Sequence, residues 1–305
     1  MTTVDGGVTS QGDLWAQLVA RTKEAQAHGN QQSIPTHSEE RQDHGLPFFL
    51  RVVENLGKKD NQREHLPRVS TNEQHPLSPF LPPEEDLFVA DISSTHFSVL
   101  NKFNVFDHHL LIVTREFEEQ DRLLNEADFE ALWRCLQAFP SIGFYNGGEA
   151  AGASQQHKHL QVIPVDIHNP IRSAPWLPLI DQYARPGTVT DVAELPFQHG
   201  LLGIDIAGSV QPGTALRDTY FTLLKQTGRN ASPETATRQE LPYNLLVTPT
   251  WMLMVPRSQE RWHDISINAL GFVGAMLVRD EDQAADLKSY GPLAALTEVG
   301  MPKAD

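Results

Sequence analysis

The chain has a single cysteine, Cys135, among 305 residues. One cysteine excludes an internal disulfide framework and a zinc site built on cysteines. The sequence contains no run of about 18 uncharged apolar residues, so it predicts no membrane-spanning helix. Its opening residues, MTTVDGGVTSQGDLW, lack the basic and apolar regions of a secretory signal. We therefore expect a cytoplasmic protein with no membrane partner.

Positive charge is also scarce. Lys and Arg number 24 against 39 Asp and Glu, which gives a formal net charge of −15. Binding to nucleic acid requires clustered cations that displace counterions from phosphates, so this composition argues against a general nucleic-acid binder. A small anionic ligand is still compatible, because backbone N–H groups, a few placed cations or a divalent metal can hold it.

The first half of the chain predicts several strands and two helices. Apolar spacing predicts a helix over residues 12–28, followed by a polar loop over 29–45. Strands are predicted at 48–56, 87–92, 97–106 and 110–114, with a long connection over 60–86 and a hairpin around Asp107. Asn125 as N-cap and Pro140 as stop predict a helix over 126–139, in which we expect the Cys135 thiol to be buried and inert.

The second half is predicted to complete one fold. Residues 164–213 are rich in proline and predict irregular structure, and a helix is expected over 214–227. Residues 243–247 and 252–255 predict a hairpin, and two short helices are expected over 281–289 and 292–299. Together these elements predict the α+β class with mainly antiparallel strands packed by helices.

The most informative stretch of the sequence contains His157, His159 and Gln161, which are spaced by two. On a strand, residues two apart point to the same face, so both imidazoles and the amide are expected in one site. Leu160 and Val162 then face the core. Lys158 does not suit a core, and we expect it at the edge of the strand.

Two alternate histidines permit three interpretations: metal ligands, polar residues on a solvated face, or a nucleophile and its neighbour. No third ligand, whether cysteine, histidine or carboxylate, lies nearby at a ligand spacing, which disfavours a metal site. The preceding glycines, with Ser154 and Gln155, can bring backbone N–H groups close to phosphates. Such a loop beside a neutral imidazole of pKa about 6.5 favours attack by histidine on a phosphorus atom.

The run YNGGEAAGASQQHKHLQVIP, residues 145–164, resembles the active-site segment of diadenosine tetraphosphate phosphorylases. These enzymes are also called ATP adenylyltransferases and form a branch of the histidine-triad (HIT) superfamily. Segments 100–114, 242–258 and 267–280 resemble further parts of the same family. The resemblance implies a HIT-like antiparallel sheet of the type shared with galactose-1-phosphate uridylyltransferase (GalT). It divides the chain into an N-terminal helix and loop (1–45), a HIT-like catalytic region (46–185) and an ATP-adenylyltransferase region (186–305) that completes the fold.

The resemblance also implies a reaction. Diadenosine tetraphosphate (Ap4A) and phosphate would give ATP and ADP, reversibly, through an adenylyl group on His159. A divalent cation, Mg²⁺ in the first place, would bind through the substrate phosphates, without a dedicated metal site in the protein. Three alternatives are weaker: Gln161 disfavours a hydrolase, the lone cysteine disfavours a sugar-1-phosphate uridylyltransferase, and the intact motif disfavours a non-catalytic nucleotide sensor.

The resemblance assigns a role to each residue of the motif. His159 is the nucleophile, His157 supports the leaving phosphates, and Gln161 holds the adenylated group and favours phosphate over water. Ala275 stands where the family has a larger apolar residue, and Arg279 where it has lysine. The substrate-binding residues it implies are Lys58, Asn101, Lys102, Asn146, Gly152, Ala153, Ser154, Gln155, Asn268, Ala269, Leu270, Ala275 and Arg279.

Several residues also have an ordinary structural interpretation. Taken alone, Lys58 and Lys102 are typical surface lysines, and Asn146 is typical of a turn. His108 and His109 are predicted as hairpin residues and not as ligands. Trp251, Trp262 and Phe272 are expected in the core. Arg257 suits a carboxylate or a phosphate partner equally, and the sequence does not decide between them.

Overall fold

The computed structural model describes residues 11–53, 78–166, 173–206, 208–228, 238–239 and 241–303. Within them, a nine-stranded sheet forms the centre, and each neighbouring pair of its strands is antiparallel. This confirms the α+β class predicted from the sequence. In sheet order the strands are β3 (Phe88–Asp91), β4 (His96–Leu100), β5 (Leu110–Thr114), β7 (His159–Pro164), β6 (Ser141–Gly147), β10 (Tyr243–Val247), β11 (Trp251–Pro256), β9 (Gly200–Gly203) and β8 (Val189–Thr190).

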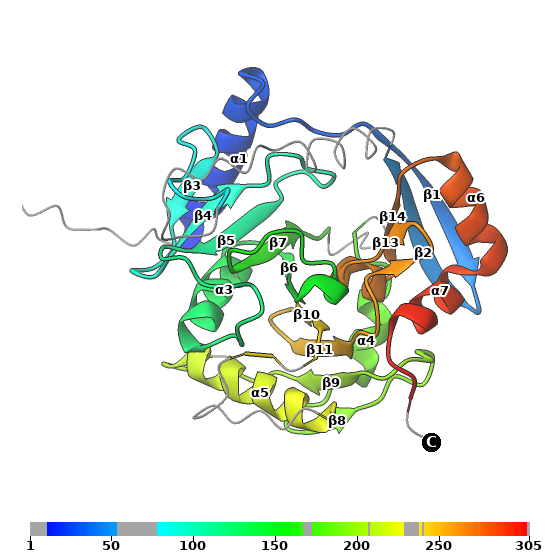
Figure 1. Cartoon of the computed structure of the whole chain (residues 1–305). Helices are drawn as coiled ribbons and strands as arrows, with labels where there is room; N and C mark the ends of the chain where they lie inside the picture. Colours follow the sequence, from blue (N-terminus) through cyan, green and yellow to red (C-terminus); the bar gives the residue numbers. More distant parts are fainter. Residues whose placement is uncertain are drawn as a thin grey trace, which may run out of the picture.

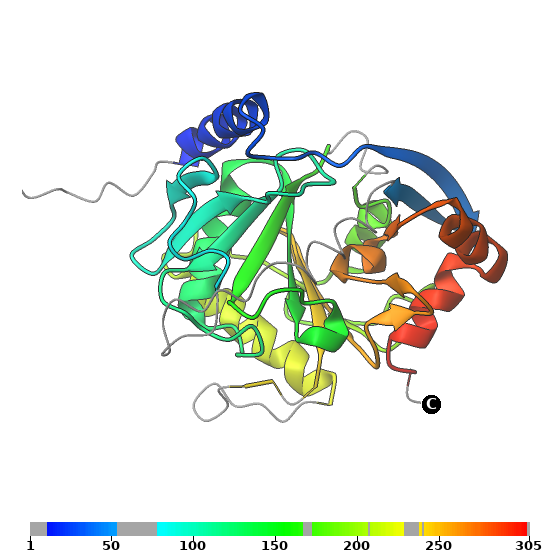
Figure 2. The same cartoon turned by 45° about the horizontal axis from the view of Figure 1, so that its top comes forward.

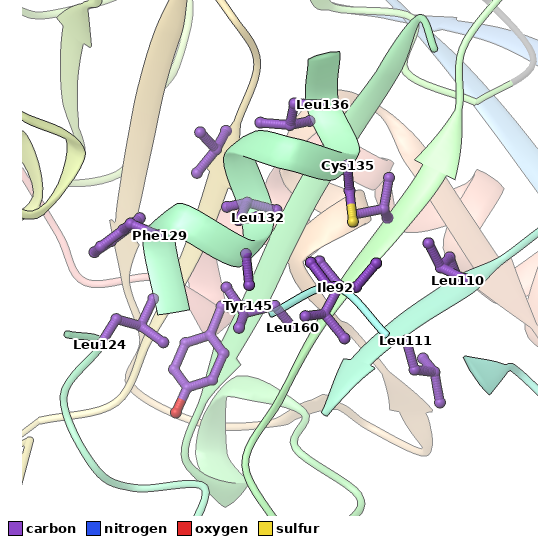
Figure 3. Packing of buried hydrophobic residues seen from close by; sticks show 14 of the residues in the cluster. Ile92, Leu110, Leu111, Leu124, Phe129, Leu132, Cys135, Leu136, Tyr145 and Leu160 are labelled. Carbon is purple, nitrogen blue, oxygen red and sulfur yellow. The ribbon is translucent and has the colours of Figure 1, made fainter. Parts of the chain in front are cut away.

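Three helices cover one face of this sheet. They are α1 (Gln11–Ala27), α3 (Glu126–Ala138) and α5 (Pro212–Gln226), and α3 packs against both of the others (Figure 1). The helices close a hydrophobic cluster with the side chains that β5, β7 and β10 direct toward them. Figure 3 shows part of it, where Leu132 and Cys135 of α3 lie above Leu160 of β7. Burying this apolar surface is the main favourable contribution to folding.

Helix α3 begins and ends as the sequence predicts. The Asn125 side chain accepts hydrogen bonds from the backbone N–H groups of Ala127 and Asp128, and the Asp128 carboxylate accepts one from the Asn125 N–H, which forms a capping box. Cys135 is fully buried in the cluster, and burial raises the pKa of its thiol to about 12. The expected burial is confirmed, and the raised pKa disfavours the thiolate, which is the reactive form.

The other face of the large sheet packs against a second layer. This layer holds a three-stranded sheet of β1 (Thr36–Asp43), β2 (Leu46–Val53) and β14 (Ala275–Val278), in which β2 and β14 are parallel. In both views this small sheet and its helices lie on the side of the molecule away from α1 and α3 (Figures 1 and 2). A second hydrophobic cluster joins the layers and includes Trp251, Trp262 and Phe272, as expected. The layer's remaining elements are α4 (Leu177–Tyr183), β12 (Arg261–Trp262), β13 (Ile265–Ser266), η3 (Ala269–Val273), α6 (Glu281–Tyr290) and α7 (Pro292–Val299).

Two predicted irregular regions contain regular structure. The prediction of a loop over 29–45 is wrong, because residues 36–43 form β1. The β1 sequence, THSEERQD, has no apolar alternation because the strand lies at a half-exposed edge of its sheet. Residues 164–213, expected to be irregular, include α4, β8 and the fully buried β9. The strand expected over 97–106 ends at Leu100. The connection predicted over 60–86 lies mostly outside the described residues. Among those residues, no helix is long and apolar enough to cross a membrane.

Candidate active site

Strand β7 is the fourth of the nine strands in the large sheet, between β5 and β6, and carries two of the three motif residues. Its register pairs His159 with Val113 of β5 and pairs Gln161 with Phe144 of β6. Leu160 and Val162 belong to the hydrophobic cluster on the opposite face. The predicted alternation is therefore confirmed. His157 lies just before β7, in an isolated bridge with Glu119.

A hydrogen bond to the backbone fixes the tautomer of His159. Its Nδ1 lies 2.8 Å from the carbonyl oxygen of His157, and a carbonyl oxygen can only accept. Nδ1 therefore carries the proton, and Nε2 keeps its lone pair. Within the described residues, no hydrogen bond reaches Nε2. With a lone pair and no proton, Nε2 can attack an electrophile but cannot donate a hydrogen bond.

Burial keeps this imidazole neutral. The side chain of His159 is 5% exposed, and burial lowers its pKa to about 4, partly opposed by the hydrogen bond to His157. A cation without water is costly in such surroundings, so the neutral ring is favoured. The ring of Phe80 lies beside it, with 5.3 Å between centroids. At neutral pH the lone pair of His159 is therefore available.

His157 is held at both ring nitrogens. Its Nε2 lies 3.2 Å from the carbonyl oxygen of Glu116, so this nitrogen is the donor, and the hydroxyl of Thr114 lies 2.8 Å away. Its Nδ1 is close to the hydroxyl of Ser78, which donates to it. Burial lowers the pKa of His157 as well. In this arrangement, a phosphate oxygen can bond to Nδ1 only if Ser78 moves away and Nδ1 gains a proton, because phosphate oxygens accept hydrogen bonds.

Gln161 is oriented by a chain of hydrogen bonds. The backbone N–H of Phe103 donates to Asn101 Oδ1 at 3.2 Å, which leaves the Asn101 amide N–H to donate to His109 Nδ1 at 3.1 Å. The proton of His109 must then be on Nε2, which lies 2.9 Å from Gln161 Oε1. Gln161 consequently directs its N–H₂ group away from His109. The position of His109 next to the hairpin turn is as predicted, but its contact with Gln161 was not expected.

The glycine-containing loop lies against the C-terminal part of the chain. Gly152 ends the short helix η1 (Glu149–Ala151) at φ +86°, and a Cβ there would lie 3.3 Å from the Cα of Asn268. Asn146, at the end of β6, accepts the backbone N–H of Ala269 at 3.1 Å. Asn268 caps η3 by accepting from Leu270 N–H. The structure thus brings these predicted binding residues together, although 116 positions separate Gly152 from Asn268.

The other predicted binding residues lie in different places. Ala153, Ser154 and Gln155 follow η1 in the loop that leads to β7. Lys102 donates to both carboxylate oxygens of Glu84, and Arg279 donates to Asp280 at 3.1 Å. Ala275 is buried at the start of β14. Within the described residues, no hydrogen bond joins these last three to the histidines. Lys58 lies outside the described part of the chain.

Lys158 corrects the expectation of a residue at the strand's edge. It is fully buried behind the motif, with its Nζ 2.5 Å from Asp128 and 3.2 Å from Glu118. Asp128 also lies 3.0 Å from His96 Nε2. Burial alone raises the pKa of Asp128, but the His96 hydrogen bond and the Lys158 charge lower it overall. The carboxylates allow a lysine at this core position, because a buried charge needs a partner.

Sequence reasoning missed several residues that hold the site. Gln120 accepts the backbone N–H of His159 at 2.8 Å and donates to the Asn146 carbonyl at 3.1 Å, so it ties β7 to β6. Ser78, Thr114, His109 and Asn244 also contact site residues. No motif marks them, because each is distant in sequence. A correct strand register would have placed Thr114 and His109 at the two ends of the β5 segment that pairs with β7.

The described residues contain one group of side chains with metal-ligand spacing: His37, Glu39 and Glu281. It lies on β1 and α6, and Lys288 already binds Glu39 at 2.9 Å.

Arg257, whose partner the sequence left open, gives its hydrogen bonds to neutral oxygens.

Comparisons with known proteins cover most of the chain. The model of the Ap4A phosphorylase N-terminal domain matches residues 6–182, and that of the ATP adenylyltransferase C-terminal domain matches residues 193–302. Diadenosine 5′,5‴-P1,P4-tetraphosphate phosphorylase 2 of Saccharomyces cerevisiae is 27% identical over 255 residues, which are 73% of this chain and 76% of that protein. Protein APA1 of the same yeast is 25% identical over 321 residues, covering 95% of each.

The fold matches as well. The crystal structure of yeast Ap4A phosphorylase Apa2 aligns with a TM-score of 0.78 at 21% identity, covering 98% of this chain and all of that one. The structure of Apa2 in complex with Ap4A aligns with a TM-score of 0.76 at 20% identity, over 97% of this chain and 100% of that one. The two family models follow one another over nearly the whole chain, and one of them spans the loop and the motif described above. The chain belongs to the Ap4A phosphorylase family.

Proposed function

We propose that this protein is a nucleotidylyltransferase that catalyses the reversible phosphorolysis of Ap4A, in which Ap4A and phosphate give ATP and ADP. The observation that carries this assignment is the state of His159. The proton sits on Nδ1, against the His157 carbonyl, and the lone pair sits on Nε2 of a buried, neutral ring. The yeast relatives that align with most of this chain, at 27% and 21% identity, are named as Ap4A phosphorylases, which supports Ap4A as the substrate.

The reaction proceeds in two displacements. His159 Nε2 attacks the α-phosphorus of one adenosine; a P–N bond forms, the bridging P–O bond breaks, and ATP leaves with the electron pair. The imidazole becomes cationic, and the His157 carbonyl at Nδ1 stabilises it. Phosphate then attacks the same phosphorus, the P–N bond breaks, and ADP leaves with the ring neutral again. Most of the catalysis is positioning and stabilisation of charge.

We assign the remaining roles from the contacts. Gln161, fixed by His109, presents N–H groups to the adenylyl phosphate and disfavours water as acceptor. Asn146 and the loop from Gly152 to Gln155 provide donors to the phosphates. His157 contacts the leaving phosphates once Ser78 moves away and Nδ1 takes up a proton, because a phosphate oxygen only accepts hydrogen bonds. Asn268, Ala269 and Leu270 bind next to that loop, and Asn101, Lys102, Ala275 and Arg279 contribute more distant contacts. For Lys58, which lies outside the described residues, the proposed phosphate contact rests on the family resemblance alone.

A divalent cation, Mg²⁺, accompanies the substrate in this proposal. The one group of described side chains with metal-ligand spacing lies on β1 and α6 and not at the motif, and Mg²⁺ often binds through substrate phosphates. The cation is therefore held by the polyphosphate. Activity should fall to background in excess EDTA and return with Mg²⁺. Full activity in EDTA would exclude this role.

The assignment is tested by incubating the protein with Ap4A and Mg²⁺, with and without phosphate, and separating the products. ATP with ADP, formed only when phosphate is present, supports the proposal. ATP with AMP in both tubes would show a hydrolase, and no product would favour the uridylyltransferase or the sensor.

Mass spectrometry at low phosphate should show one added adenylyl group, which His159→Ala abolishes. A mutant with more than a few per cent of wild-type turnover would exclude His159 as nucleophile.

We also propose that the protein works in the cytoplasm. Its one cysteine is a buried free thiol in α3, which suits a reducing compartment. Fractionation of cells that produce a tagged full-length chain tests this, and recovery in an organelle or secreted fraction would contradict it.

A further inference from the structure

Arg257 is a buried cation behind the proposed phosphate site. Its side chain is 2% exposed, and burial lowers its pKa to about 9, which still leaves it charged at neutral pH. A guanidinium group only donates hydrogen bonds. It donates to the Asn244 side-chain oxygen at 2.5 Å. Its other acceptors are the carbonyl oxygens of Val299, Ile267, Gln259 and Glu260.

Arg257 thereby fixes the orientation of the Asn244 amide. Because Oδ1 of Asn244 must face the guanidinium, its N–H₂ group must face the other way. There it donates to Asn146 Oδ1 at 2.9 Å and to the Ala151 carbonyl in η1 at 2.8 Å. Asn244 is fully buried, and each of its side-chain polar groups is already bonded within the protein. It therefore does not need to touch the substrate to affect it.

Hydrogen bonds fix the orientation of the Asn146 side-chain amide in the same way. Its Oδ1 accepts from Asn244 and from the backbone N–H of Ala269, so both lone pairs are used by donors whose direction cannot change. The N–H₂ group of Asn146 is then the end that faces away from both donors. Asn146 and Asn244 are paired residues on β6 and β10 and point to the same face of the sheet as His159 and Gln161. An amide N–H₂ group on this face suits phosphate oxygens.

We propose that Asn244, oriented by Arg257, is a positioning residue for polyphosphate binding. It fixes the amide of Asn146 so that N–H₂, and not the carbonyl oxygen, faces the phosphates, and it also anchors η1 through Ala151. The hydrogen bond from Arg257 determines which way the Asn244 amide is turned, and Asn244 in turn determines the orientation of the Asn146 amide. The inference rests on the proposed function, because it takes Ap4A as the ligand whose phosphates Asn146 meets.

Substitution of Asn244 by aspartate reverses this arrangement while keeping the side-chain shape. Aspartate still accepts from Arg257, so the core contact is kept. Its second oxygen, however, faces the Asn146 Oδ1 and the Ala151 carbonyl and cannot donate to either. Asn146 can donate to that oxygen only by rotating its N–H₂ group toward residue 244, which gives up the bond from the Ala269 N–H and presents the Asn146 oxygen to the phosphates. Substitution by leucine removes both hydrogen bonds without adding a charge, and leaves only Ala269 to orient Asn146.

Affinity for Ap4A with Mg²⁺ is measured by calorimetry in a His159→Ala background, where no turnover occurs. Loss of one hydrogen bond corresponds to about a tenfold effect. We expect Kd to rise about tenfold with Asn244→Leu, and about 100-fold with Asn244→Asp, where a donor is replaced by an acceptor. With His159 present, KM should rise more than kcat falls. In the Asn146→Ala background, Asn244→Leu should change Kd less than about threefold, because coupled residues are not additive.

Tyr220→Phe is the matched control for loss of a buried hydrogen bond. It removes a hydroxyl 2.6 Å from Tyr243 on the opposite face of β10, so it should lower the melting temperature and leave Kd unchanged. An unchanged Kd in both Asn244 variants would overturn the inference, as would a tenfold effect that persists without Asn146. If the two variants unfold, Arg257→Lys, which keeps one donor, should still raise Kd. Failure of the His159→Ala protein to bind Ap4A, with no turnover by wild type, would instead contradict the proposed function.

Discussion

His109 donates its Nε2 proton to the side-chain oxygen of Gln161 at 2.9 Å, although 52 positions separate the two residues. The neighbouring Asn101 accepts a backbone N–H and so can only donate to His109 through its amide. The direction of every hydrogen bond in this chain is therefore determined. It fixes which end of the Gln161 amide is free for the adenylyl phosphate, and two predictions concern the groups on this face.

The first prediction is that His109→Phe increases hydrolysis of the adenylyl intermediate relative to phosphorolysis. Phenylalanine keeps the ring but cannot donate to Gln161, so the amide is free to rotate. We expect phosphorolysis to slow about 10-fold, the usual effect of one lost hydrogen bond, and the yield of AMP relative to ADP to rise. Products are quantified by chromatography at fixed phosphate.

The control for this variant is the adjacent His108→Asn. His108 has φ +55°, which asparagine tolerates, and its ring contacts Thr22 and Trp15 rather than Gln161. This change should lower stability slightly and leave the product ratio as in wild type. An equal change of ratio in both variants would show that the effect arises from disturbance of the hairpin.

The second prediction concerns pH. Burial lowers the pKa of His159 to about 4, and the nucleophile must be unprotonated. As the pH falls, kcat/KM should therefore hold through the usual histidine range near 6.5 and decline only toward pH 4. The measurement is kcat/KM from pH 8 to pH 4, with protein integrity followed by circular dichroism. An acid limb centred near pH 6.5, with the fold intact, would contradict a buried neutral His159.

Local patterns in the sequence were sufficient for much of this fold. The hairpin of β10 and β11 and the helix α3 were predicted within about two residues at either end, because each has its own period, cap or stop signal. The glycine loop and the spacing of His159 and Gln161 indicated the candidate site for a similar reason. These signals lie within a few residues of one another in the chain.

Features that depend on distant residues were not predicted. Strand β1 is polar on both sides and becomes a strand only because it pairs with β2. Lys158 is an unfavourable core residue until Asp128 and Glu118 lie beside it. Likewise Asn244 and His109 have no distinguishing pattern of their own. Their roles follow from the strand register, which a single sequence does not reveal.

The third prediction is that Lys158→Met strongly destabilises the protein. The substitution leaves the fully buried Asp128 without its cation, and removal of one partner from a buried ion pair typically costs about 3–5 kcal/mol. The free energy of unfolding from urea titrations measures the effect. Lys303→Met is the control, since its pair with Asp191 is partly exposed and should contribute about 0–1 kcal/mol. Similar losses in both variants would exclude a special role for the buried pair.

The fourth prediction is that Gly152→Ala weakens substrate binding through the close contact of residue 152 with Asn268, and not through backbone strain alone. Alanine there would adopt φ +86°, at a cost of about 1–2 kcal/mol, and its Cβ would lie 3.2 Å from the Ile267 carbonyl and 3.3 Å from Asn268 Cα. The loop and η3 must then move apart, so KM for Ap4A should rise about 10-fold or more, as expected when a phosphate donor loses its alignment. Gly187→Ala carries a similar backbone cost at φ +70° with open space around it, and should lower stability without changing KM. If the two variants shift KM equally, general destabilisation and not the contact between Gly152 and Asn268 governs binding.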